Sequence, residues 1–199
     1  MTSLSALRFA DVRLQTSRLV LAPPDAGDAG PLLDYYVRNR PHFRPWEPRR
    51  EASFYTVEGM AGRIGAQRDA MRRQQALHLL LRAADAGTIV GECGFTNIVR
   101  GPFQACHLGF SLCRDAEGQG LMHEALRCAL DFVFAGLGLH RVMANYRPEN
   151  ARSARLLGRL GFEQEGLARA YLHIDGQWRD HVLTSLIDDD TRRAPTRIA

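Results

Sequence analysis

The sequence predicts one mixed α/β domain, and three observations lead to this fold class. Runs that alternate apolar and polar residues, as β-strands do, recur along the chain and are clearest at 104–113. Apolar residues at helical spacing fill several stretches between these runs. A glycine-containing segment joins one strand directly to a helix. The 199 residues, 45% of them hydrophobic, suffice for a single core. We expect one domain over 11–188, with flexible termini at 1–10 and 189–199.

The N-terminal part is predicted to contain a strand and two helices. Residues 11–23 have the pattern of an opening strand, which Pro23-Pro24 ends. Either Asp25 or Asp28 can cap a first helix, which we expect to continue to about residue 38. A second helix is expected over about 56–75.

Thr56 is the predicted N-cap of this second helix. Between the two helices, residues 39–48 contain too many prolines for regular structure and are predicted to form a loop. Phe43 and Trp46 in this loop either pack onto their own domain or form a wall of a substrate pocket.

The remaining elements are read from the same two periodicities. Glycine or proline turns separate them, and Gly136 and Gly161 end two of the helices. The predicted elements are strands at 76–84, 88–99 and 104–113, a helix from 121 to about 135, a strand at 140–146, a helix at 151–160, and a long hairpin of 162–174 with 178–187.

Composition excludes several classes of protein. No apolar run approaches the roughly 20 residues that span a bilayer, and the N-terminus lacks the pattern of a signal peptide. The cysteines lie in apolar patterns without C-x-x-C spacing, so we expect reduced core thiols in a cytoplasmic protein. The histidines are scattered without metal-ligand spacing, so no metal site is expected. The four cysteines are Cys93, Cys106, Cys113 and Cys128.

The formal net charge is +4, and every basic residue other than histidine is arginine. A basic excess favours acidic partners such as RNA, the ribosome or a phosphate-rich cofactor. The excess is modest and spread along the chain, however, and we find no nucleic-acid-binding motif. We therefore prefer a solvated arginine-rich surface as the explanation.

The segment 114–120 carries the strongest chemical signal. A strand that enters a helix through a glycine loop presents free backbone amides beside the positive end of the helix dipole. Gly118 and Gly120 allow a bulky anion such as a pyrophosphate to approach the backbone. A tight turn without a ligand is the alternative interpretation of the segment taken alone.

Three segments, together with the order of elements, resemble the GNAT acetyltransferases. They are Gly118–Met122, Asn145–Ser153 and Leu160–Gly166. The resemblance extends from about Val12 to Ile187. It implies a mainly antiparallel sheet that splays between its fourth and fifth strands and is flanked by helices. It also implies acetyl-CoA as the co-substrate.

Other segments resemble the RimJ-type family within that superfamily, whose members acetylate the N-terminal alanine of ribosomal protein uS5. They are 44–48, 97–101, 120–126 and 171–183, the last being long and unusual in composition. The resemblance implies an enzyme whose substrate is a protein N-terminus and which associates with the ribosome. Two alternatives stay open: a GNAT enzyme that acetylates a small amine such as an antibiotic or polyamine, and a ribosome- or RNA-associated binding protein without catalysis.

By resemblance, the acetyl-CoA site combines loop amides, a strand end and a helix start. Leu157 stands where many members of the family have a tyrosine acid, and Glu117 adds a carboxylate to the anion loop, where it must point outward or pair with Arg114. The cofactor residues implied are Leu112, Cys113, Gly118, Gln119, Gly120, Leu121, Met122, Asn150 and Ser153.

Direct attack of an amine on the thioester requires a base. At pH 7 an α-amine loses its proton at a cost of about 1 kcal/mol, whereas a lysine side chain requires about 4.6 kcal/mol. A modest base therefore suffices for a protein N-terminus. Glu165 is the first candidate and Glu92, between apolar neighbours on a strand, is the second. Ser153 and Asn150 complete the predicted catalytic set, and Asn150 also suits an ordinary N-cap.

The acceptor is expected to enter a cleft in extended form. Aromatic side chains are candidates for its walls, and Asp180 or Glu47 is a candidate for binding the ammonium group. The aromatic candidates are Tyr35, Trp46, Tyr171 and Trp178.

Overall fold

The computed structural model describes residues 9–188, so the predicted flexible segments lie outside the described residues except for 9–10. An eight-stranded sheet has the order β1-β2-β3-β4-β5-β6-β8-β7. Neighbouring strands are antiparallel throughout, except that β5 and β6 are parallel. In chain order the elements are β1 (Leu14–Gln15), β2 (Leu19–Ala22), α1 (Ala29–Phe43), α2 (Val57–Arg72), β3 (Leu77–Ala83), β4 (Ile89–Val99), β5 (Ala105–Leu112), α3 (Leu121–Asp131), β6 (Arg141–Met143), α4 (Ala151–Leu160), β7 (Glu163–Ile174) and β8 (Gln177–Ile187). The predicted mixed, mainly antiparallel sheet flanked by helices is confirmed.

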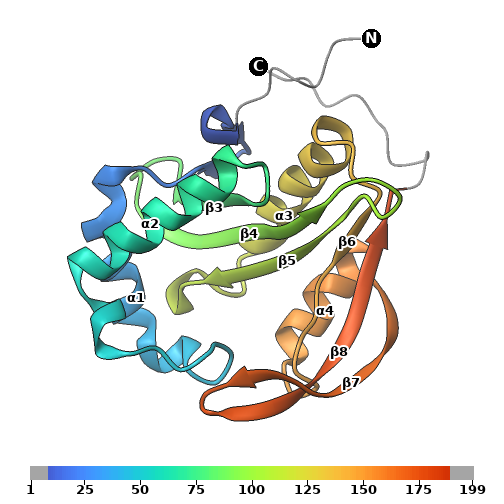
Figure 1. Ribbon diagram of the computed structural model, residues 1–199. Coiled ribbons are helices and arrows are strands. Elements are labelled where there is room, and N and C mark those ends of the chain that lie inside the picture. The colour runs from blue at the N-terminus through green and yellow to red at the C-terminus, as the bar shows by residue number, and fades with distance from the viewer. Residues whose placement is uncertain (1–8, 189–199) are drawn as a thin grey trace.

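The two parallel strands pair only at their beginnings. Ala105–His107 on β5 lie beside Arg141–Met143 on β6, after which β5 continues to Leu112 and β6 ends. Figure 1 shows β4 and β5 diverging from the β6–β8–β7 part of the sheet. The resemblance predicts a splay between the fourth and fifth strands. In the structure these are β5 and β6, because the predicted opening strand is divided into β1 and β2.

Helices cover both faces of the sheet, as Figure 1 shows, and β3 is buried between them. Leu79 and Leu81 belong to the core that includes α3 and α4, whereas Leu80 belongs to the core that includes α1 and α2. Successive side chains of a strand point to opposite faces, so one strand contributes to both cores. The burial of this apolar surface is the main favourable contribution to folding.

The first helix is longer than predicted. It was expected to end near residue 38, but α1 continues through Pro41 to Phe43. Tyr35, Tyr36 and Phe43 are buried together, and the Phe43 ring lies 5.3 Å from that of Tyr35 and 5.9 Å from that of Tyr36. Aromatic packing therefore overrides the proline signal, because Pro41 removes a single hydrogen bond near the end of the helix.

The prediction of one opening strand over 11–23 is wrong, because the chain reverses at 16–18 to form the antiparallel pair β1 and β2. Thr16 stabilises this turn through hydrogen bonds with the backbone of Leu19. Thr56 caps α2 as predicted by accepting a hydrogen bond from the Gly59 amide, although α2 ends at Arg72 rather than at 75. That 11–188 form one domain stays a prediction, which the continuous sheet from 14 to 187 favours.

Candidate active site

A cavity of about 700 Å³ opens beside the end of β5. We call it the main cavity. Its walls are the end of α1, residues 46–47 of the following loop, residues 110–112 of β5, part of the 117–123 loop, and the first turns of α4. The divergence of β5 from β6 separates the two walls formed by β5 and α4, which leaves room for a ligand between them.

The loop before α3 presents backbone amides to this cavity. Gly118 and Gly120 have φ angles of 75° and 78°, in the left-handed region that favours glycine. Gly120 is the N-cap of α3 and no side chain accepts a hydrogen bond there. The amides of the first turn thus keep their capacity to bind an anion, and the helix dipole adds positive charge.

The ion pair of Arg18 with Glu124 supports this loop. Arg18 Nη1 donates to the carbonyl of Gln119 at 2.9 Å, and Arg18 Nε donates to Glu124 Oε2 at 2.7 Å. Ser17 Oγ donates to the same carboxylate at 3.0 Å. The pKa of Glu124 falls to about 2, because hydrogen bonds from Thr16, Arg18 and Ser17 outweigh the opposing effect of burial. Sequence reasoning did not identify Arg18, which lies about a hundred residues from the loop in the chain.

Glu117 lines the main cavity and has two partners, one of them an arginine. His42 Nε2 lies 3.2 Å from Glu117 Oε1, and Arg152 Nη1 lies 2.6 Å from Glu117 Oε2. The expected alternatives were an outward orientation or a pair with Arg114, and the structure shows neither. The carboxylate instead connects α1 to α4 across the cavity, which removes much of its repulsion toward a bound anion.

The start of α4 adds positive charge to the opposite wall. Asn150 Oδ1 caps the helix by accepting a hydrogen bond from the Ser153 amide at 3.0 Å, and both residues line the cavity. Arg152, Arg155 and Arg159 also line it. Sequence reasoning did not identify these arginines, although their spacing of three and four residues places them on one face of the helix. Three guanidinium groups suit the phosphates of a nucleotide cofactor.

A second cavity, of about 720 Å³, meets the main cavity at Phe43 and Glu47. We call it the arginine cavity. Arginines dominate the charged part of its wall, and the turn between β7 and β8 closes one side through Asp175. Its lining includes Tyr36, Arg40, Arg44, Glu47, Arg49, Arg50, Glu51, Tyr55 and Asp175.

Glu47 lies where the two cavities meet, and its side chain is 21% exposed. Burial raises its pKa to about 7, with a further contribution from the negative charge of Glu92; Arg50 and Arg63 oppose the shift. The backbone carbonyl of Glu47 accepts a hydrogen bond from the Asp175 amide at 3.1 Å. This contact holds the loop against the β7–β8 turn.

Glu92, the second base predicted from sequence, is engaged on both oxygens. Arg63 Nη2 donates to them at 2.8 and 2.9 Å, and the Tyr36 hydroxyl also donates to Glu92. Its oxygens are thus occupied by donors from α1 and α2, and its negative charge acts on Glu47. Glu47, with its pKa raised to about 7, is a carboxylate in the range that base catalysis uses. Sequence reasoning considered it only as a site for the ammonium group.

Comparison with protein families matches residues 18–163 to the acetyltransferase (GNAT) domain. The chain is 46% identical over 179 residues to the [ribosomal protein uS5]-alanine N-acetyltransferase of Escherichia coli, covering 90% of this chain and 92% of that one. The chain belongs to the GNAT acetyltransferases. The resemblance seen in the sequence, including that to RimJ-type enzymes, is confirmed.

Solved structures agree with this assignment. A ribosomal-protein-S5-alanine acetyltransferase from Vibrio fischeri has a TM-score of 0.86 at 38% identity, covering 90% of this chain and 98% of that chain. RimJ of Mycobacterium smegmatis in complex with CoA-disulfide has a TM-score of 0.82 at 28% identity, covering 88% and 86%. The chain is thus an N-acetyltransferase that uses acetyl-CoA. The free loop amides and the arginines of α4 fit the phosphates of that co-substrate.

The structure separates the cofactor residues predicted from sequence into two groups. Cys113 and Gln119 are absent from the lining of the main cavity, since Cys113 packs against the core that includes α1 and α2, and the Gln119 side chain donates to the carbonyl of Asp115 at 3.0 Å. The residues that do line it are Leu112, Gly118, Gly120, Leu121, Met122, Asn150 and Ser153.

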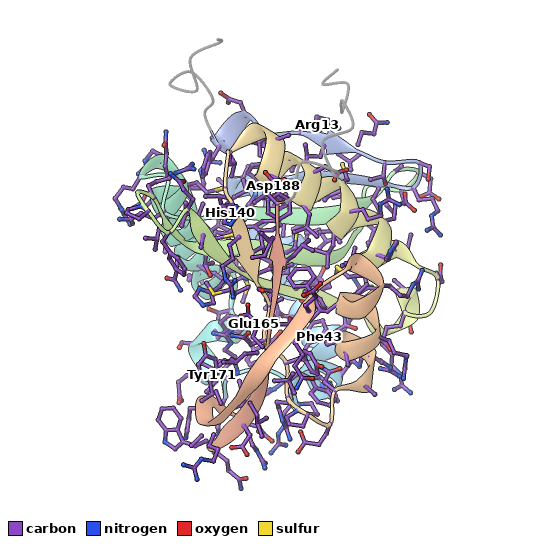
Figure 2. The ribbon with its side chains drawn as sticks, turned by 90° about the vertical axis from the view of Figure 1, so that its right-hand side faces the viewer. Arg13, Phe43, His140, Glu165, Tyr171 and Asp188 are labelled. Atoms are coloured by element: carbon purple, nitrogen blue, oxygen red, sulfur yellow. The ribbon has the colours of Figure 1, made fainter. Side chains whose placement is uncertain are left out.

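Of the four aromatic residues expected at the acceptor, only Trp46 lines a described cavity. Tyr35 is 0% exposed, and its hydroxyl lies 2.9 Å from Ser111 Oγ, which lines the main cavity in its place. The Tyr171 hydroxyl accepts a hydrogen bond from Asn145, and Trp178 is 65% exposed on β8. Figure 2 shows Tyr171 on the β7–β8 hairpin.

Glu165, the first base predicted from sequence, lies on β7 and lines neither cavity. It forms an ion pair with Arg141 and accepts a hydrogen bond from Ser185 Oγ at 2.8 Å. These two partners hold the pKa of Glu165 below its usual value. Asp180, the alternative site for the ammonium group, accepts a hydrogen bond from the Ala170 amide at 2.8 Å and also lies outside the cavities. Figure 2 shows Glu165 on the hairpin.

Leu157 has a hydrocarbon side chain and cannot donate a proton, and it is 2% exposed within the core. Within residues 9–188, no cluster of three or more His, Cys, Asp or Glu side chains suits a metal ion. No helix in the same range is long and apolar enough to cross a membrane.

Proposed function

We propose that this enzyme transfers the acetyl group of acetyl-CoA to the N-terminal alanine of ribosomal protein uS5 in the cytoplasm. The activity of the Escherichia coli relative, with 46% identity over nearly the whole chain, supports this acceptor. The observation that carries the mechanism is that the two cavities meet at Glu47. Acetyl-CoA occupies the main cavity, and the acceptor enters from the arginine cavity.

On the acetyl-CoA side, we propose that amides of the Gly118–Met122 loop bind the pyrophosphate. Backbone donors lose no rotamer entropy on binding, and the α3 dipole reinforces them. The arginines of α4 neutralise the remaining phosphate charge. Asn150 and Ser153 contact the pantetheine, and Leu112 lies at the strand end beside it.

On the acceptor side, Glu47 replaces Glu165 as the proposed base. Its pKa of about 7 lies close to the roughly 7.7–8.0 of an α-amine, so the proton moves between well-matched groups. Glu47 accepts one proton from the ammonium form, the free amine attacks the thioester carbonyl, and the C–S bond then breaks. Glu92 and Arg63 tune Glu47 without touching the amine.

The leaving thiolate requires a proton, and Leu157 cannot supply it. We propose that Ser153 relays the second proton of the attacking amine to the sulfur, since its side chain lines the cavity beside Asn150. The amine nitrogen has lost two protons at the end, one to Glu47 and one to the thiol.

The proposal is tested with purified enzyme, acetyl-CoA and a peptide of the uS5 N-terminus that begins with alanine. We expect thiol release together with one added acetyl group on the α-amine, located by mass spectrometry. The same peptide with a blocked α-amine and a free lysine is the control. Turnover confined to a panel of small amines would refute the acceptor, and binding of acetyl-CoA without thiol release would refute catalysis.

A further inference from the structure

The arginine cavity carries more charge than base catalysis requires. Four arginines and three carboxylates line it, and burial keeps Glu47 partly protonated near neutral pH. The cavity therefore has a surplus of between one and two positive charges. A cationic wall is an unfavourable place to bring an ammonium group, unless the ligand carries compensating negative charge.

The surplus can be assigned to particular residues. Arg44 pairs with Asp175 at 3.0 Å, and Arg50 lies 3.9 Å from Glu47. Arg40 and Arg49 have no carboxylate within 4.0 Å among the residues that the structure describes. Two guanidinium groups thus line this cavity without an ion-pair partner, against one carboxylate, Glu51, that also has none among the described residues.

Arg40 is also held in place. Its guanidinium carbon lies 4.4 Å from the centre of the Tyr55 ring, over the ring. Stacking on an aromatic face fixes the plane of the group and leaves its N–H donors free at the edge. A guanidinium restrained in this way loses less entropy when it binds a carboxylate through two parallel hydrogen bonds.

The position of the cavity limits what its ligand can be. Because Glu47 lines both cavities, an acceptor whose amine reaches Glu47 beside the main cavity has room for its following residues in the arginine cavity. An extended peptide advances about 3.3 Å per residue, so the residues close behind the N-terminus lie there. A volume of about 720 Å³ is in the range of ligand-binding pockets.

We propose that the arginine cavity is a specificity site for an acidic side chain of the acceptor, carried within the first few residues behind the acetylated N-terminus. Arg40 and Arg49 bind its carboxylate. This inference rests on the proposed function, and it adds a requirement on the acceptor sequence beyond the N-terminal alanine.

The test compares alanine-starting peptides that differ only by Glu, Gln or Lys at the second, third or fourth position. At the position that reaches the cavity, we expect kcat/KM for the Glu peptide to exceed that for the Gln peptide by about 10-fold, equivalent to one charge-assisted hydrogen bond. The Lys peptide should be the poorest, and the Glu preference should decrease with added salt.

Variants assign the effect to the cavity. Arg49→Gln and Arg40→Gln should each reduce the Glu preference, and Arg49→Glu should shift the preference toward the Lys peptide. Arg38→Gln is the matched control, because Arg38 is an exposed arginine of α1 that lines neither cavity. It should retain the full preference.

Three failures are distinguishable. Turnover of all three peptides at rates within twofold of each other would overturn the specificity site and leave the proposed function intact. Absence of turnover with every peptide would overturn the proposed function and this inference with it. A Glu preference that persists in Arg40→Gln, Arg49→Gln and the double variant would overturn the assignment to the arginine cavity.

Discussion

The main cavity and the arginine cavity meet at Glu47, but the chain builds them in different ways. The main cavity combines three segments that are far apart in the chain, within residues 42–47, 110–123 and 149–159. The arginine cavity combines the end of α1, the loop up to α2, and Asp175 from the β7–β8 turn. The main cavity thus offers backbone amides at a helix start, whereas the arginine cavity is lined mainly by charged side chains of one stretch, residues 36–55, together with Asp175.

This difference separates binding from chemistry. Backbone amides at a helix start have a fixed geometry and need no tuning. A carboxylate that serves as a base near pH 7 needs burial and neighbouring charges from several elements, as Glu47 receives from Glu92, Arg50 and Arg63. We therefore expect substitutions in the loop before α3 to weaken acetyl-CoA binding, and substitution of Glu47 to slow the acetyl transfer.

The largest effect should come from Glu47→Gln. Loss of a general base typically lowers the rate by about 10²–10⁴-fold. Because burial raises the pKa of Glu47 to about 7, the wild-type rate should increase as pH rises through 7 and the carboxylate form accumulates. The rate of the variant should no longer depend on the titration of residue 47. It should increase with pH only as the α-amine of the acceptor loses its proton. Steady-state kinetics from pH 5.5 to 9 measure both; wild-type rates would place the base elsewhere.

A smaller effect, confined to binding, is expected from Gly120→Ala. The Gly120 φ of 78° costs an alanine roughly 1–2 kcal/mol, so the loop either shifts or weakens its hold on acetyl-CoA by about 10-fold. Isothermal titration measures the affinity. Gly65→Ala in α2 is the control, since an added Cβ there meets nothing within 4 Å. Unaltered affinity in Gly120→Ala would contradict the anion site.

Arg18→Ala tests the support of the same loop and should act more weakly. Without Arg18 the Gln119 carbonyl loses its donor, and we expect a loss in acetyl-CoA affinity of about 3- to 10-fold, with the acceptor KM unchanged. Arg13→Ala, at another exposed arginine near β1, is the control. An effect on the acceptor KM alone would contradict this role.

Arg18→Ala should also change the stability of the protein at low pH. The folded-state pKa of Glu124 is lowered from 4.5 to about 2, so its contribution to stability is present above pH 4.5 and is lost as pH falls toward 2. Removing Arg18 should shift acid unfolding to higher pH. Far-UV circular dichroism during acid titration follows this shift, which Arg13→Ala should not produce.

The smallest effect is expected from Glu165→Gln. Its ion pair with Arg141 lies outside both cavities, and exposed pairs contribute about 0–1 kcal/mol to stability. We expect kcat to change by less than about twofold on that basis. A loss comparable to that of Glu47→Gln would return Glu165 to the role of base and break the division between the two cavities.

The sequence by itself determined the features that depend on neighbouring residues. The alternation of 104–113, the glycine pair Gly118 and Gly120, and the Asn150 cap lie within short segments, so local periodicity and backbone preferences suffice to place them. The resemblance to the GNAT acetyltransferases added acetyl-CoA. The helix from 151 to 160 was predicted with its observed bounds.

Tertiary structure decided the groups whose chemistry depends on distant partners. Glu47 has a raised pKa because folding buries it and places it near the negative charge of Glu92, against the opposing effect of Arg50 and Arg63. Glu165 has a lowered pKa because β6 and β8 supply Arg141 and Ser185. Both are ordinary carboxylates in the sequence. Burial and charge act through space, so only the folded chain distinguishes a base from a surface ion pair.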